Sequence, residues 1–408
     1  MSPAVEESMP DPNNVRQWLS ERHLNILDKF EMELKLGGLA TDSRTANGMF
    51  GAADRLVVAS RTVELLKVMI GSTRWKNAAQ LLLLLRGLGR ELHAVGGFRE
   101  PAIGNVVRRV MAAVREEVVT GGRSNTNRPS MQNMLWANPQ PQQLNASRHN
   151  HTRDSSSSAV EYSTRGDDFP AAFYVDRPDF KPTIMEAIQE IMLDLEDTQS
   201  NIDDQASSYI HADEVVLAYG KSKSIESFLK AAAAKKRSFQ VVVCEGAPHM
   251  GGIEMAKSLA EAGIDTIVIN DSATFAVMAR VNKVLLPAHA VLANGGLIAS
   301  SGCNMVALAA MRMAVPVVCV TGLFKLCPMF PHEGQDTLQD LVSASSVLDL
   351  KELSDPLMKA VEFLNPVHDY IAPELINLYV TNVGAFQPSY IYRLLAENYH
   401  SDDWESFE

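Results

Sequence analysis

Residues 240–270 read QVVVCEGAPHMGGIEMAKSLAEAGIDTIVIN, and this stretch decides the fold. It begins with an apolar run at 240–244, continues with a helical pattern over 253–262, and ends in a second apolar run at 265–269. Short runs that are apolar at nearly every position predict strands buried on both faces, and such strands belong to parallel sheets. The stretch therefore predicts one strand–helix–strand unit of an α/β fold.

The same alternation extends to both sides of this unit. Further strands are expected at 214–218, 283–286, 315–320 and 375–381, and further helices near 224–235, 272–280, 304–313 and 388–399. Near-continuous apolar strands separated by helices predict a Rossmann-like, doubly wound parallel sheet over residues 206–408. In such sheets ligands bind at the carboxyl ends of the strands.

The first half of the chain has a different pattern. Apolar residues recur at helical spacing before residue 120 and again over 181–204, so residues 1–205 are expected to form a helical domain. Residues 121–158 are dominated by Asn, Gln, Ser and Pro and have almost nothing to bury, which predicts a disordered insertion at about 121–178. The pair His149-x-His151 inside it either holds a metal ion weakly or belongs to a solvated loop.

The charge balance excludes some partners. The chain has 49 acidic and 37 basic side chains, a net charge of −12, whereas phosphate contacts to nucleic acid or anionic lipid favour a basic surface. Residues 181–204 carry a net −6 and residues 397–408 a net −5. We therefore expect no nucleic-acid partner, and two acidic patches that suit a basic protein partner.

The sequence also gives expectations about compartment. No apolar run approaches the ~20 residues of a membrane span, and the first 14 residues lack the basic and apolar regions of a secretory signal. The chain has four cysteines and no C-x-x-C pair, which favours a reducing compartment with buried thiols. We expect a cytosolic protein without a membrane partner.

Polar residues follow several of the expected strands. Gly220-Lys221-Ser222 stands where a phosphate-binding loop would end, but Val215 occupies the place of the glycine that such a loop needs. A helix N-terminus with a lysine can still hold a phosphate monoester. Asp271 either caps the next helix or faces the crevice with a catalytic role, and Asn294-Gly295-Gly296 is typical of a turn.

No complete catalytic or metal site emerges from these residues. Cys303 is either a nucleophile whose pKa is lowered by a helix N-terminus or a small buried residue, and the other strand cysteines fit a core. Three histidines are scattered without metal-ligand spacing: His249, His289 and His368. We predict no catalytic residue, no metal site and no cofactor.

Longer motifs near the C-terminus carry a resemblance. They read NPVHDYIAPELI at 365–376, TNVG at 381–384 and PSYIYRL at 388–394. Together with RWKNA at 74–78 and LANG at 292–295, they resemble the alpha/beta/delta subunit family of eukaryotic translation initiation factor 2B. The segments 324–331 and 399–403 most resemble the beta branch of that family.

The resemblance bears on catalysis. The family is similar to isomerases of methylthioribose 1-phosphate and ribose 1,5-bisphosphate, which share its motifs at Asp271, Asn294-Gly295 and Asn365-Pro366. The positions of the catalytic cysteine and aspartate of those isomerases fall at or near Gly220 and at His289 in this chain. Neither residue supplies the side chain that the reaction needs, so the resemblance implies a protein that is not an enzyme.

The resemblance also implies partners. It predicts a regulatory, scaffolding subunit of the exchange factor that replaces GDP by GTP on initiation factor 2, with partners among the alpha, gamma, delta and epsilon subunits in a decamer. The chain is expected to pair with delta through its α/β domain. Its helical domain is expected to bind the alpha subunit of factor 2 and to sense the phosphorylation of that subunit. Glu186 and Glu190 are candidates for binding this partner, and Tyr390 and Tyr392 for the subunit interface. A solvated helix face and core packing are the respective alternatives.

Two other functions stay open. A phosphosugar isomerase or sensor would use a vestigial crevice formed by Lys221, Asp271 and Asn294. A plain homo-oligomeric Rossmann-like protein would instead form a stable homodimer without a delta subunit.

Overall fold

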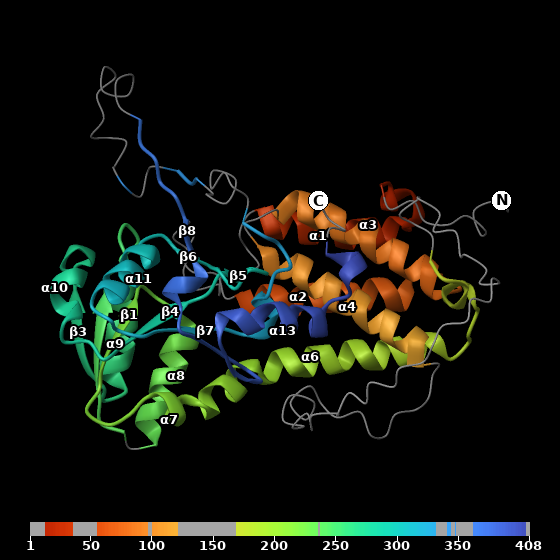
Figure 1. The fold of residues 1–408 in the computed structure, drawn as a ribbon. Coiled ribbons are helices and arrows are strands. Elements are labelled where there is room, and N and C mark those ends of the chain that lie inside the picture. The colour runs from red at the N-terminus through yellow and green to blue at the C-terminus, as the bar shows by residue number, and fades with distance from the viewer. Residues whose placement is uncertain are drawn as a thin grey trace, which may run out of the picture.

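The computed structural model describes residues 13–35, 55–96, 100–120, 169–235, 237–331, 341–343, 347 and 362–404. The chain forms a helical part and an α/β part that lie side by side in Figure 1. Helix α6 (Phe180–Asp204) runs beneath the helical part and packs against α8 (Lys223–Ala234) of the α/β part. The predicted fold class is confirmed, and the predicted domain boundary at 205 falls directly after α6.

The helical part contains the longest helices of the described residues. Its other elements are η1 (Val15–Trp18), α1 (Glu21–Lys35), α2 (Arg55–Ser72), α3 (Ala78–Gly96), α4 (Pro101–Thr120) and η4 (Ala171–Tyr174), whereas the short α7 (Ala206–Tyr209) packs on α8 of the α/β part. The apolar stripe predicted on α6 is confirmed, because Ile184, Ile188, Ile191 and Leu195 are all buried in the core of this part.

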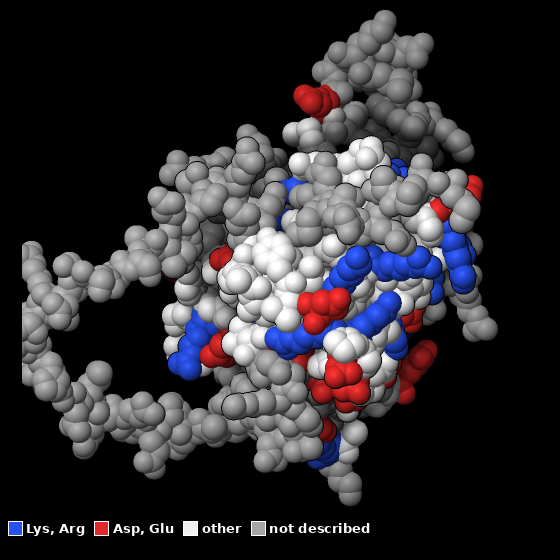
Figure 2. Space-filling model, turned by 90° about the vertical axis from the view of Figure 1, so that its right-hand side faces the viewer, with Lys and Arg blue, Asp and Glu red and all other residues white. Residues whose placement is uncertain are grey.

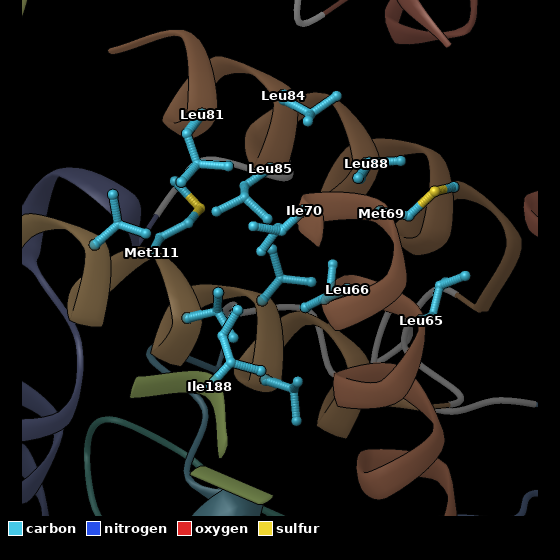
Figure 3. Packing of buried hydrophobic residues seen from close by; sticks show 14 of the residues in the cluster. Leu65, Leu66, Met69, Ile70, Leu81, Leu84, Leu85, Leu88, Met111 and Ile188 are labelled. Atoms are coloured by element: carbon cyan, nitrogen blue, oxygen red, sulfur yellow. The ribbon is translucent and has the colours of Figure 1, made fainter. Parts of the chain in front are cut away.

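Helix α3 lies at the centre of the helical part and is buried on nearly all sides. Its five leucines, Leu81–Leu85, are at most 4% exposed. In Figure 3 the labelled side chains of α2, α3, α4 and α6 meet in one cluster. A helix that is apolar all round is stable in water only when neighbours cover it, and three helices do so here. No helix in the described part of the chain combines the length and hydropathy of a membrane span.

The structure describes only the last part of the predicted insertion. Residues 121–168 lie outside the described residues, but 169–178 are described and contain η4. Phe173 is 7% exposed and stacks on Phe169 with ring centroids 5.7 Å apart. The prediction of disorder is therefore wrong for 169–178, because two aromatic rings give this segment enough apolar surface to bury.

The α/β part alternates strands and helices. Its first half contains β1 (Val215–Tyr219), α8, β2 (Gln240–Cys244), α9 (Gly251–Glu261), β3 (Asp265–Ile269), η5 (Asp271–Ala273), α10 (Thr274–Met278) and β4 (Lys283–Pro287). Its second half contains β5 (Ala290–Val291), β6 (Leu297–Ser300), α11 (Cys303–Arg312), β7 (Val317–Val320), η6 (Leu323–Lys325), β8 (His368–Ile371), η10 (Pro373–Leu375), β9 (Leu378–Thr381), β10 (Gly384–Phe386), η11 (Pro388–Tyr390), α13 (Ile391–Asn398) and η12 (Ser401–Asp403).

The main sheet has the order β10-β9-β7-β4-β1-β2-β3. All neighbours are parallel except β9 and β10. The chain runs from β1 outward to β3 and then returns to the other side of β1, so the order reverses between β1 and β4. Ligands of doubly wound sheets bind at such a reversal, at the carboxyl ends of the central strands, and we call this place the crevice. Separate apolar clusters cover the two faces of the sheet.

Two features of the sheets differ from the prediction. A second, small sheet of order β5-β6-β8 was not expected, because its strands are only two to four residues long. Strand β3 was expected to be buried on both faces, yet Ile267 and Val268 are 43% and 44% exposed. The prediction of a fully covered sheet is wrong at this edge strand.

Candidate functional site

The crevice is built around Asp271, which follows β3. Its carboxylate accepts hydrogen bonds from the backbone N–H groups of Gly246 (3.0 Å) and Ala247 (2.8 Å), and from the Tyr219 hydroxyl (3.3 Å). It makes no capping bond within its own helix, so the N-cap interpretation is wrong, and its carboxylate binds the loop after β2 instead. Two adjacent backbone N–H groups are a favourable place for an anion, and here the chain's own carboxylate fills it.

Lys221 lies at the mouth of the same crevice. Its ammonium forms an ion pair with the carboxylate of Glu254 on α9. The next residue, Ser222, is the N-cap of α8 and accepts a 3.4 Å hydrogen bond from the Ile225 N–H. The side chains of Lys221 and Ser222 thus bind other groups of the chain, at the place where the sequence allowed a phosphate.

Cys303 lies at the start of α11 but has no features of a nucleophile. Asp369 accepts hydrogen bonds from the backbone N–H groups of Gly302 (2.7 Å) and Asn304 (3.2 Å), which places a carboxylate at this helix N-terminus. Burial, and after it the Asp369 carboxylate, raise the pKa of the Cys303 thiol well above its usual value. Since only the thiolate is a good nucleophile, the interpretation of Cys303 as a small buried residue holds.

The two positions that the resemblance linked to catalysis are Gly220 and His289. Gly220 has φ +61° directly after β1 and has no side chain to react. His289 is buried, and its ring stacks on His368 with centroids 4.0 Å apart. Burial lowers the pKa of His368 to about 3, so this ring is neutral at physiological pH.

Asn294 stands in the turn between β5 and β6, as predicted. Its amide donates to the Tyr370 hydroxyl (2.8 Å) and its oxygen accepts from the Gly296 N–H (2.9 Å). Gly295 has φ +81°, and a Cβ there would approach the Pro388 carbonyl oxygen to 2.5 Å. The contacts of Asn294 thus stabilise the turn of the small sheet, whereas those of Lys221 and Asp271 stabilise the loops after β1 and β2.

No group of three or more His, Cys, Asp or Glu side chains in the described residues is arranged to hold a metal ion. The pair His149-x-His151 lies outside the described residues.

The predicted acidic face of α6 is exposed. Glu186 and Glu190, four residues apart, both point away from the buried stripe of this helix. Leu193 lies one turn further along the same face and is 50% exposed. The sequence analysis named the two carboxylates of this face but not the exposed Leu193 beside them.

The second predicted acidic patch, within residues 397–408, differs in part from the prediction. The Asp403 side chain is 0% exposed and binds Arg115, and Glu397 pairs with Arg393 at 2.9 Å. The prediction of an acidic patch is therefore wrong for Asp403, which is buried against Arg115, whereas Glu397 and Asp402 are exposed as expected. Figure 2 likewise shows acidic and basic side chains next to each other on the end of the molecule that carries the helical part.

The tyrosines predicted at an interface are only partly covered. Tyr390 stacks on Phe386 with centroids 5.2 Å apart, and the Arg393 guanidinium lies 5.3 Å from its ring. Tyr392 is 53% exposed and packs edge-on against Trp404 at 5.4 Å. Core packing therefore does not account for Tyr392.

An exposed apolar surface on the α/β part was missed by the sequence analysis. We call it the apolar face; its members are 42–58% exposed and are Ile267, Phe275, Met305, Leu308 and Met311, whereas Val268 points to the opposite face of the sheet. They belong to β3, α10 and α11, and α10 packs against α11. The signal was present, because α11 reads CNMVALAAMR, apolar on more than one side, whereas a helix on a solvated surface is polar on its outer side. Exposed apolar side chains gathered on two helices that pack together are typical of an interaction site.

Comparison with known proteins agrees with this architecture. Residues 51–388 match the model of the initiation factor 2 subunit family. The chain belongs to this family. The matched residues include those of the crevice, of the apolar face and of the acidic face of α6.

Individual relatives point to one branch of the family. The chain is 37% identical to translation initiation factor eIF2B subunit beta of Dictyostelium discoideum over 85% of this chain and 91% of that protein. It is 35% identical to the subunit of the same name from Schizosaccharomyces pombe, over 88% and 94%. The resemblance to the beta branch is confirmed.

Solved structures show the same fold. A chain in the crystal structure of the tetrameric eIF2B-beta2-delta2 complex from C. thermophilum superposes with a TM-score of 0.63 at 24% identity. The similarity covers 95% of this chain and 97% of that chain. That chain therefore contains both a helical part and an α/β part like those described here.

Proposed function

We propose that this chain is a beta-type subunit of eukaryotic translation initiation factor 2B, with a regulatory and scaffolding role in the exchange of GDP for GTP on factor 2. The observation that carries the proposal is a contrast between two places. The side chains of the apolar face are exposed, whereas the polar groups of the crevice bind one another. A surface that is apolar and uncovered suits protein binding, whereas a crevice filled by the chain's own side chains suits no substrate.

The proposed partner of the apolar face is a delta subunit. The proposal is supported by the chain in the beta–delta tetramer named above, which has the same fold. Tyr390 and Tyr392 are proposed to lie at the subunit interface as well. The alpha, gamma and epsilon subunits are proposed as further partners in the cytosol.

The proposed contact with factor 2 lies on α6. Glu186 and Glu190 are exposed on one face with Leu193 beside them, so a basic surface of the alpha subunit of factor 2 would meet both charge and an apolar centre. This contact is how the chain would sense phosphorylation of the partner, because added phosphate repels carboxylates.

The pairing proposal is tested on α11. Leu308 and Met311 are 46% and 58% exposed, so changing both to Asp should leave the fold intact. Pairing would bury these two charges without partners, so we expect the affinity for delta to fall at least about a hundredfold in a binding titration.

The matched control is Val57→Asp with Val68→Asp on α2, which are 43% and 47% exposed. This variant should bind delta like the unchanged chain. Equal binding by the α11 variant and the unchanged chain would remove the apolar face from the proposal.

A further inference from the structure

A buried charge cluster joins the end of the chain to the helical part. The Asp403 carboxylate accepts two hydrogen bonds from Arg115, Nε to Oδ2 at 2.8 Å and Nη2 to Oδ1 at 2.9 Å. Arg86 donates to the same Oδ1 at 3.4 Å, and Arg108 donates to the Asp403 backbone carbonyl at 3.1 Å. The three arginines belong to α3 and α4, which are more than 280 residues earlier in the chain.

The cluster is shielded from water. The Asp403 side chain is 0% exposed, and those of Arg86 and Arg115 are each 7% exposed. The Phe169 ring lies 5.7 Å from the Arg86 guanidinium and 5.6 Å from that of Arg115. Ion pairs in such surroundings are screened little by salt, and each guanidinium depends on the carboxylate opposite.

The same segment also binds the α/β part. The Tyr399 hydroxyl donates to the Leu326 carbonyl at 2.9 Å, and Trp404 packs against Tyr392 of α13. The loop that carries Leu326 is itself tied to α4, because Asn105 donates to the Phe324 carbonyl at 3.1 Å. Figure 1 shows the end of the chain turning back from α13 onto the helical part.

We propose that residues 399–404 form a C-terminal strap, and that the buried Asp403 carboxylate holds the helical part and the α/β part at one fixed angle. The strap bridges the two parts, because this single short segment contacts α3 and α4 of the helical part as well as α13 and the loop after β7 of the α/β part. Its release would change how the acidic face of α6 and the apolar face are presented together.

The test compares two neighbouring residues in the full chain. Asp403→Asn keeps the shape and removes the buried charge. Asp402→Asn removes an equal charge from a side chain that is 62% exposed and that contacts the cluster through a longer ion pair with Arg115, at 3.7 Å. A third variant ends at His400, which removes the strap's carboxylate and opens the arginines to water.

Hydrogen exchange measures release of the strap. In Asp403→Asn we expect amides of residues 399–404 to exchange on the order of a hundredfold faster, while amides of β1 and β2 keep their rates. Asp402→Asn should match the unchanged chain. An equal acceleration everywhere would show ordinary loss of global stability and would overturn the proposal.

A spin-label distance measures the angle. The labels are attached to cysteines introduced by Glu64→Cys on α2 and Glu261→Cys on α9, because both glutamates are exposed. The four native cysteines are buried and stay unlabelled. We expect one narrow distance distribution in the unchanged chain and in Asp402→Asn, and a second population in Asp403→Asn and in the shortened chain. Unchanged distances in both altered chains, or failure of both to fold, would contradict a strap.

Discussion

Single residues decide that the crevice is closed. Asp271 follows β3 and Asp369 lies within β8, and each carboxylate accepts hydrogen bonds from two backbone N–H groups that an anionic ligand would otherwise use. The sequence placed Asp271 at the carboxyl end of a strand, but its partners could not be predicted, because Gly246 and Ala247 are 25 and 24 residues away in another loop. Likewise, Asp403 looked like part of an acidic surface because its arginines lie in distant helices.

His368 gives a prediction at the same scale. Its pKa is about 6.5 in the unfolded chain and about 3 in the folded protein, because burial disfavours the imidazolium. The unfolded chain therefore binds a proton that the folded protein does not, and stability falls as the pH drops below about 6.5. We expect His368 to account for about 2 kcal/mol of lost stability between pH 7.5 and pH 5.

Urea unfolding at both pH values measures this loss. His368→Phe keeps a ring against His289 and should lose about 2 kcal/mol less than the unchanged chain on acidification. His211→Asn, which removes an exposed histidine, is the control and should behave like the unchanged chain. The same loss in His368→Phe would assign the pH dependence to other groups.

Secondary-structure elements were predicted well where they are long or buried. The six strands of the main sheet that run parallel were all expected near their observed positions, because their apolar runs are continuous. The strands β5, β6, β8 and β10 have two to four residues, too few for a periodic pattern. The pattern of α11 contained the apolar face, but a single sequence does not tell which apolar side of a helix stays uncovered.

Helix α6 gives a prediction at the scale of an element. Changing Glu186 and Glu190 together to Lys replaces attraction to a basic partner by repulsion. Exposed charge pairs contribute up to about 1 kcal/mol each, so we expect roughly a tenfold loss of affinity for the alpha subunit of factor 2. The loss should shrink as salt is added.

A binding titration at low and high salt provides the measurement. Glu21→Lys with Glu261→Lys makes the same change in net charge elsewhere on the surface and should cost much less affinity. If both double variants lose affinity equally, the effect comes from net charge and α6 is not the contact.

At the scale of the whole molecule, two parts of different architecture present different surfaces. The net charge of −12 was predicted to gather in two segments. Helix α6 exposes most of its acidic residues as expected, whereas in the described part of 397–408 Asp403 is buried and Glu397 and Asp402 are exposed. The whole-molecule arrangement depends on contacts such as Arg115 to Asp403, 288 residues apart, which no local pattern reveals.

The central claim is that this chain is a subunit that pairs with a delta-type chain of its own family. Sedimentation equilibrium of the purified chain, alone and with one equivalent of a delta subunit, tests it most directly. The account predicts that the mixture forms a complex containing both chains. A stable homodimer of this chain, unchanged when delta is added, would contradict it.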